Sequence, residues 1–159
     1  MTRLHNFARI LALATLLAAG LFTSARAAEE NRLLGHWVFS SYEIAPWTSE
    51  QEIPGLGASG KRLLKVEITF APKAVITKYK SLACADVGYE ITNFPPDALF
   101  QSGLPEPNQA AIAKKMGFPE GLVPGVDVNC SAGLFSYHFR DDKTVLLAFN
   151  NIIYTLTRK

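Results

Sequence analysis

"GLFSYHFRDDKTVLLAFNNIIYTLTRK", residues 133–159, decides the fold of this chain. It contains three runs of strand-forming residues, which are separated by very short polar turns at residues 141–143 and 150–151. Turns as short as these connect neighbouring antiparallel strands. In the first run Phe135, Tyr137 and Phe139 fall on alternate positions, so one face of that strand is aromatic. The stretch predicts an antiparallel meander that must bury an aromatic face.

Earlier segments extend this pattern toward the N-terminus. Residues 64–70 alternate cleanly, with apolar side chains on one face and polar ones on the other: Leu64, Val66, Ile68 and Phe70 against Lys65, Glu67 and Thr69. Residues 36–44, 74–80, 83–94 and 125–131 also have the composition of strands. Residues 45–60 have the composition of a loop, which could cover one end of the strands. The fold class is mainly β, an antiparallel up-and-down barrel of about seven or eight strands, because closure buries the aromatic face and removes the sheet edges.

A Pro/Gly-rich insertion at about residues 93–125 interrupts the strands and holds six of the nine prolines. Within it, residues 107–118 favour a helix, with Pro107 near the start and Gly117 near the end. Residues 95–103 predict a second short helical turn. We therefore expect an ordered helical excursion from the β scaffold.

The two cysteines, Cys84 and Cys130, have no C-x-x-C spacing. A reactive or metal-binding thiol is one interpretation, but an isolated pair in an exported chain favours a disulfide. Closing a loop of this length stabilises the fold by about 4 kcal/mol in the chain-entropy model. Such a bridge would tie the base of the insertion.

The first 27 residues predict a secretory signal peptide. Arg3 and Arg9 precede an apolar run over residues 10–22, and residues 25–27 form a small-x-small cleavage site. No cysteine lies near that site, so the pattern has no lipobox and indicates a periplasmic or secreted protein. Residues 28–159 would then form a single domain. No later apolar run is long enough to span a membrane after cleavage.

Charge argues against nucleic acid as a partner. Three of the 16 Lys and Arg residues lie in the first 27 residues, whereas none of the 14 Asp and Glu residues does. The remaining 13 basic and 14 acidic side chains give a net charge of −1, and the basic ones are scattered. Nucleic-acid binding needs a concentrated basic surface.

Gly35-His36-Trp37 on the first predicted strand, together with Arg158 on the last, resembles the signature of the lipocalins and their calycin relatives. In that family the Trp closes one end of a β-barrel and a basic residue near the C-terminus packs across the indole. The resemblance covers mainly residues 33–44 and 151–159. It implies a barrel-closing role for Gly35, Trp37 and Arg158, with any ligand at the opposite end. The insertion is foreign to a simple barrel of this kind.

Catalytic chemistry has little support in the sequence. His36 and His138 could form half of a metal site, but no third ligand recurs at a suitable spacing, so we expect no metal and no cofactor. Asp141-Asp142 is explained by turn preference, and no Gly-x-Ser-x-Gly elbow occurs. If the protein were an enzyme, the candidates would be His138 and Tyr137. We expect no catalytic residues.

The aromatic residues of the strands form the candidate ligand cavity: Phe39, Phe70, Tyr79, Phe135, Tyr137, Phe139, Phe149 and Tyr154. The alternative is a barrel core filled by these side chains. The first hypothesis is an exported, non-catalytic binding protein for a small apolar or amphipathic ligand. The second is a protein-interaction module, such as an envelope inhibitor or immunity-type factor, acting through residues 95–124. Phe94, Leu99, Phe100 and Phe118 would then be either anchors for the partner or the insertion's own core, and we favour the core.

Overall fold

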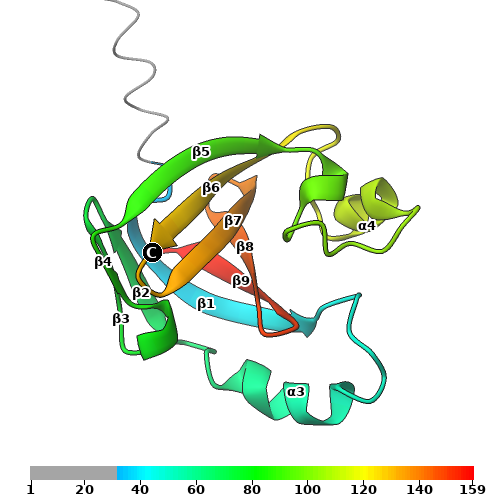
Figure 1. Ribbon diagram of the computed structural model, residues 1–159, viewed down its shortest axis with the longest axis horizontal. Helices are drawn as coiled ribbons and strands as arrows, with labels where there is room; N and C mark the ends of the chain where they lie inside the picture. The colour runs from blue at the N-terminus through cyan, green and yellow to red at the C-terminus, as the bar shows by residue number, and fades with distance from the viewer. Residues whose placement is uncertain (1–31) are drawn as a thin grey trace, which may run out of the picture. The chain divides into compact units, whose positions relative to one another are not determined.

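The computed structural model describes residues 32–159, so the predicted signal peptide lies outside the described residues. Nine strands occur in the described part of the chain: β1 (Gly35–Ile44), β2 (Glu67–Ala71), β3 (Ala74–Thr77), β4 (Cys84–Ala85), β5 (Gly88–Phe94), β6 (Val123–Cys130), β7 (Gly133–Asp141), β8 (Thr144–Phe149) and β9 (Ile152–Arg158). They form one antiparallel sheet in the order β4-β3-β2-β1-β9-β8-β7-β6-β5. The sheet curls into a half-barrel (Figure 1). The predicted mainly β, antiparallel architecture is confirmed.

The tight turns of the C-terminal meander arise from local chemistry. Asn150 and Asn151 both adopt left-handed backbone angles, φ 53° and 59°, which suit a two-residue turn between twisted strands. In the β7–β8 turn the Asp141 carboxylate accepts the backbone N–H of Lys143 at 2.8 Å. The pairing of β1 with β9, which places Trp37 opposite Arg158, is the long-range contact that joins strands β1–β4 to strands β5–β9 in one sheet.

Alternation along the strands produces two hydrophobic clusters on opposite faces of the sheet. The inner core fills the half-barrel and includes Trp37, Phe39, Ile68, Phe70, Val126, Tyr137, Phe139, Leu147, Tyr154 and Leu156. The outer core lies between the sheet and the insertion and comprises Ala45, Phe94, Leu99, Phe100, Leu104, Ala113, Phe118, Val123, Leu146 and Ile153. Neighbouring residues of one strand therefore belong to different cores, as Leu146 and Leu147 do.

The strand predicted at residues 64–70 is shorter than expected. Strand β2 begins at Glu67, and Lys65 has a left-handed backbone with φ 63°. That conformation lets the Lys65 N–H donate to the Phe39 carbonyl at 2.8 Å, while the Phe39 N–H donates to the Val66 carbonyl at 3.0 Å. As a result Leu63 is buried in the inner core, and Leu64 is only partly buried.

Residues 45–60 are not the plain loop that their composition predicts, because they contain helix α3 (Ile53–Lys61). Glycine is a poor helix former, so tertiary packing must stabilise this helix. The Tyr42 hydroxyl donates to the Gly57 carbonyl at 2.9 Å. A Cβ at Gly60 would lie only 2.2 Å from the Tyr42 ring, so the ring packs directly on the helix backbone. Helix α3 therefore runs alongside β1 (Figure 1).

The expected disulfide joins Cys84 to Cys130, with their Cα atoms 5.9 Å apart. Its position differs from the prediction. The insertion leaves the sheet between Phe94 and Val123, at the opposite end of β6 from Cys130. The bond therefore does not tie the base of the insertion; it connects β4 at one end of the sheet order to β6 near the other.

The insertion occupies residues 95–122, between the paired strands β5 and β6. It contains the 3-10 turn η2 (Pro96–Ala98) and helix α4 (Gln109–Lys115). Gly117 follows α4 with φ 83°, as the predicted helix ending requires. Another 3-10 turn, η1 (Lys80–Leu82), connects β3 to β4. Figure 1 shows the insertion at the far end of β5, away from α3.

Candidate functional site

The residues of the Gly-x-Trp signature lie at the start of β1 and pack against the last residues of β9. Trp37 is fully buried, and its indole N–H donates to the Leu33 carbonyl at 2.8 Å. The Arg158 guanidinium lies 4.4 Å from the centre of the indole ring and donates to the Leu34 carbonyl at 2.9 Å. A Cβ at Gly35, which has φ 119°, would lie 3.0 Å from that guanidinium. The glycine thus leaves room for the cation to cover the ring, a contact of about 0.5–2 kcal/mol.

The eight aromatic residues predicted to line a cavity all belong to the inner core or pack against it. Five of them are buried: Phe39, Phe70, Tyr137, Phe139 and Tyr154. Their rings meet edge to face, as in the Phe39–Tyr154 pair at 5.5 Å and the Phe70–Tyr137 pair at 5.0 Å between centroids. This part of the predicted cavity lining is packed core.

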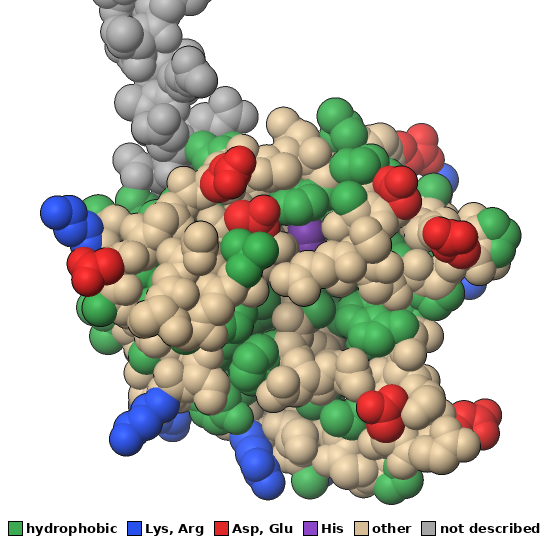
Figure 2. All heavy atoms as spheres, viewed as in Figure 1, with side chains coloured by type: hydrophobic (Ala, Val, Ile, Leu, Met, Phe, Trp, Pro, Cys, Tyr) green, Lys and Arg blue, Asp and Glu red, His purple; other side chains and the backbone are tan. Residues whose placement is uncertain are grey.

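The other three aromatic residues gather at the end of the half-barrel away from Trp37. The Phe149 ring lies 6.4 Å from that of Tyr79 and 6.2 Å from that of Phe135, and all three are only partly buried. Tyr42 and Leu56 pack on the same core beside them. We call these five residues the aromatic rim. Figure 2 shows apolar side chains on this face of the molecule between the strands and α3.

The side chains that form the inner core are uncharged, and the charged Arg158 guanidinium contacts this core only where it covers the Trp37 ring. The polar side-chain atoms of the core are the tyrosine hydroxyls, the Trp37 indole N–H and the disulfide sulfurs. Burial raises the pKa of Tyr154 to about 12 and raises that of Tyr137 further, so both phenols are neutral at physiological pH. The three buried residues that are polar, Ser136, His138 and Thr144, alternate with inner-core neighbours and therefore face outward. Such an interior suits apolar groups.

The two histidines of the described chain lie in different surroundings. His36 is exposed, and its Nδ1 lies 3.0 Å from the Thr69 hydroxyl. His138 is fully buried on the outer face, where its Nε2 accepts the backbone N–H of Phe100 at 3.0 Å. Tyr137 faces the inner core, so the structure separates the two residues that an enzyme hypothesis would pair. No group of three His, Cys, Asp or Glu side chains within residues 32–159 could hold a metal ion.

The segment that meets His138 has an unusual backbone. Phe100, Gln101 and Ser102 are consecutive left-handed residues, with φ values of 53°, 58° and 62°. Each such residue costs roughly 1–2 kcal/mol relative to ordinary backbone. The Phe100 ring packs against Trp47 at 5.8 Å and Phe118 at 6.0 Å between centroids. Tertiary packing therefore holds this turn against its intrinsic preference.

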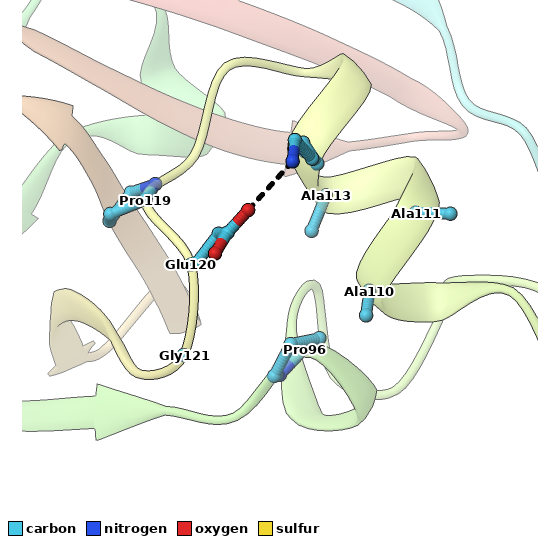
Figure 3. Close-up of a pocket in the computed structure, with 8 residues that line it drawn as sticks. Pro96, Ala110, Ala111, Ala113, Pro119, Glu120 and Gly121 are labelled. Carbon is cyan, nitrogen blue, oxygen red and sulfur yellow. Dashed lines mark hydrogen bonds and ion pairs between the residues drawn. The ribbon is translucent and has the colours of Figure 1, made fainter.

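The insertion also carries a shallow groove of about 340 Å³, which is drawn in Figure 3. Small side chains form most of its walls, including Pro96 on η2, Ala110 and Ala111 on α4, and Pro119 on the following loop. An exposed ion pair between Lys114 and Glu120, 2.6 Å long, spans one side. The four hydrophobic residues expected to form the insertion's own core are buried, but they share the outer core with Leu146 and Ile153 of the sheet: Phe94, Leu99, Phe100 and Phe118.

Sequence reasoning missed two parts of this arrangement. Tyr42 and Leu56 belong to the aromatic rim because α3 packs beside β1, and the sequence reasoning did not predict this helix. Pro54 in its first turn was the one local sign of a helix start. The contact between His138 and Phe100 crosses 38 positions of the chain, and no local pattern predicts it.

The chain matches no protein-family model, no curated protein and no solved structure. Among the described residues, no helix is both long enough and apolar enough to cross a membrane.

Proposed function

We propose that this protein is an exported, lipocalin-like, non-catalytic binding protein that holds a small apolar or amphipathic ligand at the aromatic rim. The observation that carries the proposal is the difference between the two ends of the half-barrel. Near one end Trp37 is buried beneath Arg158, whereas Tyr79, Phe135 and Phe149 remain partly exposed at the other. Partly exposed aromatic side chains beside an uncharged interior are typical of sites for apolar ligands.

The amphipathic part of this proposal rests on the rim itself. The Tyr79 hydroxyl would lie next to a ligand whose apolar part contacts Phe149 and Phe135. No acid or base is needed from the protein, which agrees with binding without chemistry. The proposed export rests on the signal-like residues 1–27 and on the disulfide, which persists in oxidising compartments.

A binding experiment tests the rim. Protein exported through its own N-terminal segment would be examined by native mass spectrometry for a copurified ligand and titrated with the amphipathic dye anilinonaphthalene sulfonate. We expect saturable binding, weakened at least about tenfold by Phe149→Ala because an apolar ring contact is lost. Ile76→Ala is the matched control, since Ile76 is an exposed apolar residue of β3 outside the rim. The absence of both a ligand mass and saturable dye binding would contradict the proposal.

The groove on the insertion favours a second candidate function, recognition of a protein partner through residues 95–124. Ala110 is exposed and its side chain points across the groove toward Pro96, so Ala110→Arg would fill the groove (Figure 3). In a capture experiment from periplasmic extract, this variant would lose a partner that the unmodified chain retains. Ser81→Arg, at an exposed position outside the insertion, is the control. Equal capture by both variants would exclude the groove as the binding surface.

A further inference from the structure

His138 lies in an aromatic enclosure between strand β7 and the insertion. Its ring has no exposed surface and meets three phenylalanine rings nearly at right angles. The centroids of Phe94, Phe100 and Phe118 lie 4.5, 4.8 and 6.4 Å from that of the imidazole. The insertion supplies two of these rings, so the histidine is buried only while the insertion is docked.

The hydrogen bond to Phe100 requires an uncharged ring. The Phe100 N–H donates to Nε2, so Nε2 carries no proton, and the single proton of the neutral ring must sit on Nδ1. Nδ1 is buried and has no hydrogen-bond partner within residues 32–159. A second proton on the ring would place two donors, Nε2–H and the Phe100 N–H, against each other. The docked arrangement and the imidazolium are therefore incompatible.

The charged groups on the outer face of the sheet near His138 are Asp127 on β6, Glu90 paired with it on β5, and Arg140 on β7. None of them bonds to the ring in the docked arrangement, and the Asp127 Oδ1 atom, like His138 Nδ1, is buried without a hydrogen-bond partner among the described residues. Strand β8 presents Leu146 opposite His138. The charged side chains of the insertion are all exposed: Asp97, Glu106, Lys114, Lys115 and Glu120. Burial accordingly lowers the pKa of His138 to about 3.

The left-handed turn also favours detachment of the insertion from the sheet once the hydrogen bond to His138 is lost. Phe100, Gln101 and Ser102 hold an unfavourable backbone while Phe100 is bonded to His138 and packed on Trp47. Losing the hydrogen bond lets these residues return to ordinary angles.

We propose that His138 is an acid-sensitive latch, in which protonation of its ring releases the insertion, residues 95–122, from the outer face of the sheet while the inner core stays folded. Release uncovers Leu146 and Ile153, which the insertion buries in the outer core. The inner core is unaffected because it lies on the other face and is tied by the β1–β9 pairing and the disulfide.

Hydrogen exchange measured by mass spectrometry on the intact, disulfide-bonded chain tests the latch. An exposed histidine has a pKa near 6.5, so the opening constant of the insertion should rise about tenfold per pH unit below that value. After correction for intrinsic exchange rates, we expect a rise of roughly 50-fold between pH 6.5 and pH 4.5 for amides of residues 95–122. Peptides from β1 and β9 should keep their protection.

Two variants identify the group responsible. His138→Gln keeps an acceptor for the Phe100 N–H but does not titrate, so its insertion should open equally at both pH values. His36→Gln is the matched control, because His36 is exposed and should leave the wild-type response unchanged. A wild-type insertion whose protection does not change with pH, or the same response in His138→Gln, would overturn the latch.

If His138→Gln does not fold, a measurement on the unmodified protein still tests the latch. Nitrogen-15 spectra of the imidazole rings should show His138 as the Nδ1–H tautomer at pH 5 in molecules whose insertion is docked. A His138 ring that is charged at pH 5 while the insertion remains protected would overturn the proposal. In that case Asp127→Asn would show whether an ion pair with Asp127 keeps the insertion docked on a charged ring. The insertion of this variant would then lose its protection at pH 5.

Discussion

The two faces of the sheet carry aromatic clusters of different construction. The inner core consists mainly of side chains from regularly alternating strands, and it has an arginine-covered Trp37 at one end. The outer core depends on an irregular insertion, a strained left-handed turn and a buried His138. Strand pairing holds the first in place, whereas docking of one loop holds the second. From this difference we expect the inner core to set the global stability of the protein, whereas the outer core can open locally with the insertion.

Trp37→Ala should produce the largest effect, because it empties one end of the inner core. We expect the free energy of unfolding to fall by about 3–5 kcal/mol, as for other fully buried aromatic residues. Chemical denaturation checks this value. Trp47→Ala is the comparison, since Trp47 is only partly buried at the outer core. If the two variants lose equal stability, the division between global and local parts is wrong.

Phe118→Ala should weaken the outer core with a smaller global effect. The ring is buried beside Phe100 and His138, but the insertion can detach without the sheet unfolding. We expect a loss of about 2–3 kcal/mol in global stability. Hydrogen exchange should show faster opening of residues 95–122 with little change in β1. If exchange increased equally in both regions, the two cores would unfold as one cooperative unit and the distinction between them would be wrong.

Acid should lower the free energy of unfolding through protonation of His138. Burial lowers its pKa to about 3 in the folded state, and the unfolded value is about 6.5. The unfolded state therefore binds more protons between these values, so the stabilisation is complete above pH 6.5 and is lost as the pH falls. We expect a loss of about 1.7 kcal/mol between pH 6.5 and pH 5.0. Denaturation curves at the two pH values measure it, and a flat profile for His138→Gln is the control.

Arg158→Gln should have the smallest effect of the four. It removes the cation over the Trp37 ring and alters the hydrogen bond to the Leu34 carbonyl. We expect a loss of about 0.5–2 kcal/mol, seen as a lower denaturation midpoint and a changed Trp37 fluorescence. Lys114→Ala breaks an exposed ion pair and serves as a control, with an expected change below about 1 kcal/mol.

Local patterns predicted the strands of the meander and both helical turns of the insertion because the relevant signals lie within a few residues. Alternation at Phe135, Tyr137 and Phe139 specifies which face is buried, and Gly117 ends α4. The same reasoning failed for α3, whose glycines argue against a helix until Tyr42 packs on them. It also misplaced the disulfide, because its relation to the insertion depends on where Cys130 lies along β6.

The candidate site also has one part that the sequence predicted and one part that only the structure shows. Composition and spacing identified the inner-core aromatics, since strand periodicity alone assigns side chains to faces. The rim formed by Tyr42, Leu56 and three of those aromatics depends on how the strand ends meet α3. The His138 latch depends on a contact with Phe100 that no sequence period encodes.

The sequence by itself therefore determined the strand-rich class, the tight turns and the assignment of residues to the two faces, because backbone propensities and alternation act over short distances. Only the tertiary structure decided which aromatic side chains stay partly exposed and which histidine is buried. These features depend on contacts between segments far apart in the chain. Packing free energy then outweighs local preference, as it does in α3 and at the left-handed turn of Phe100.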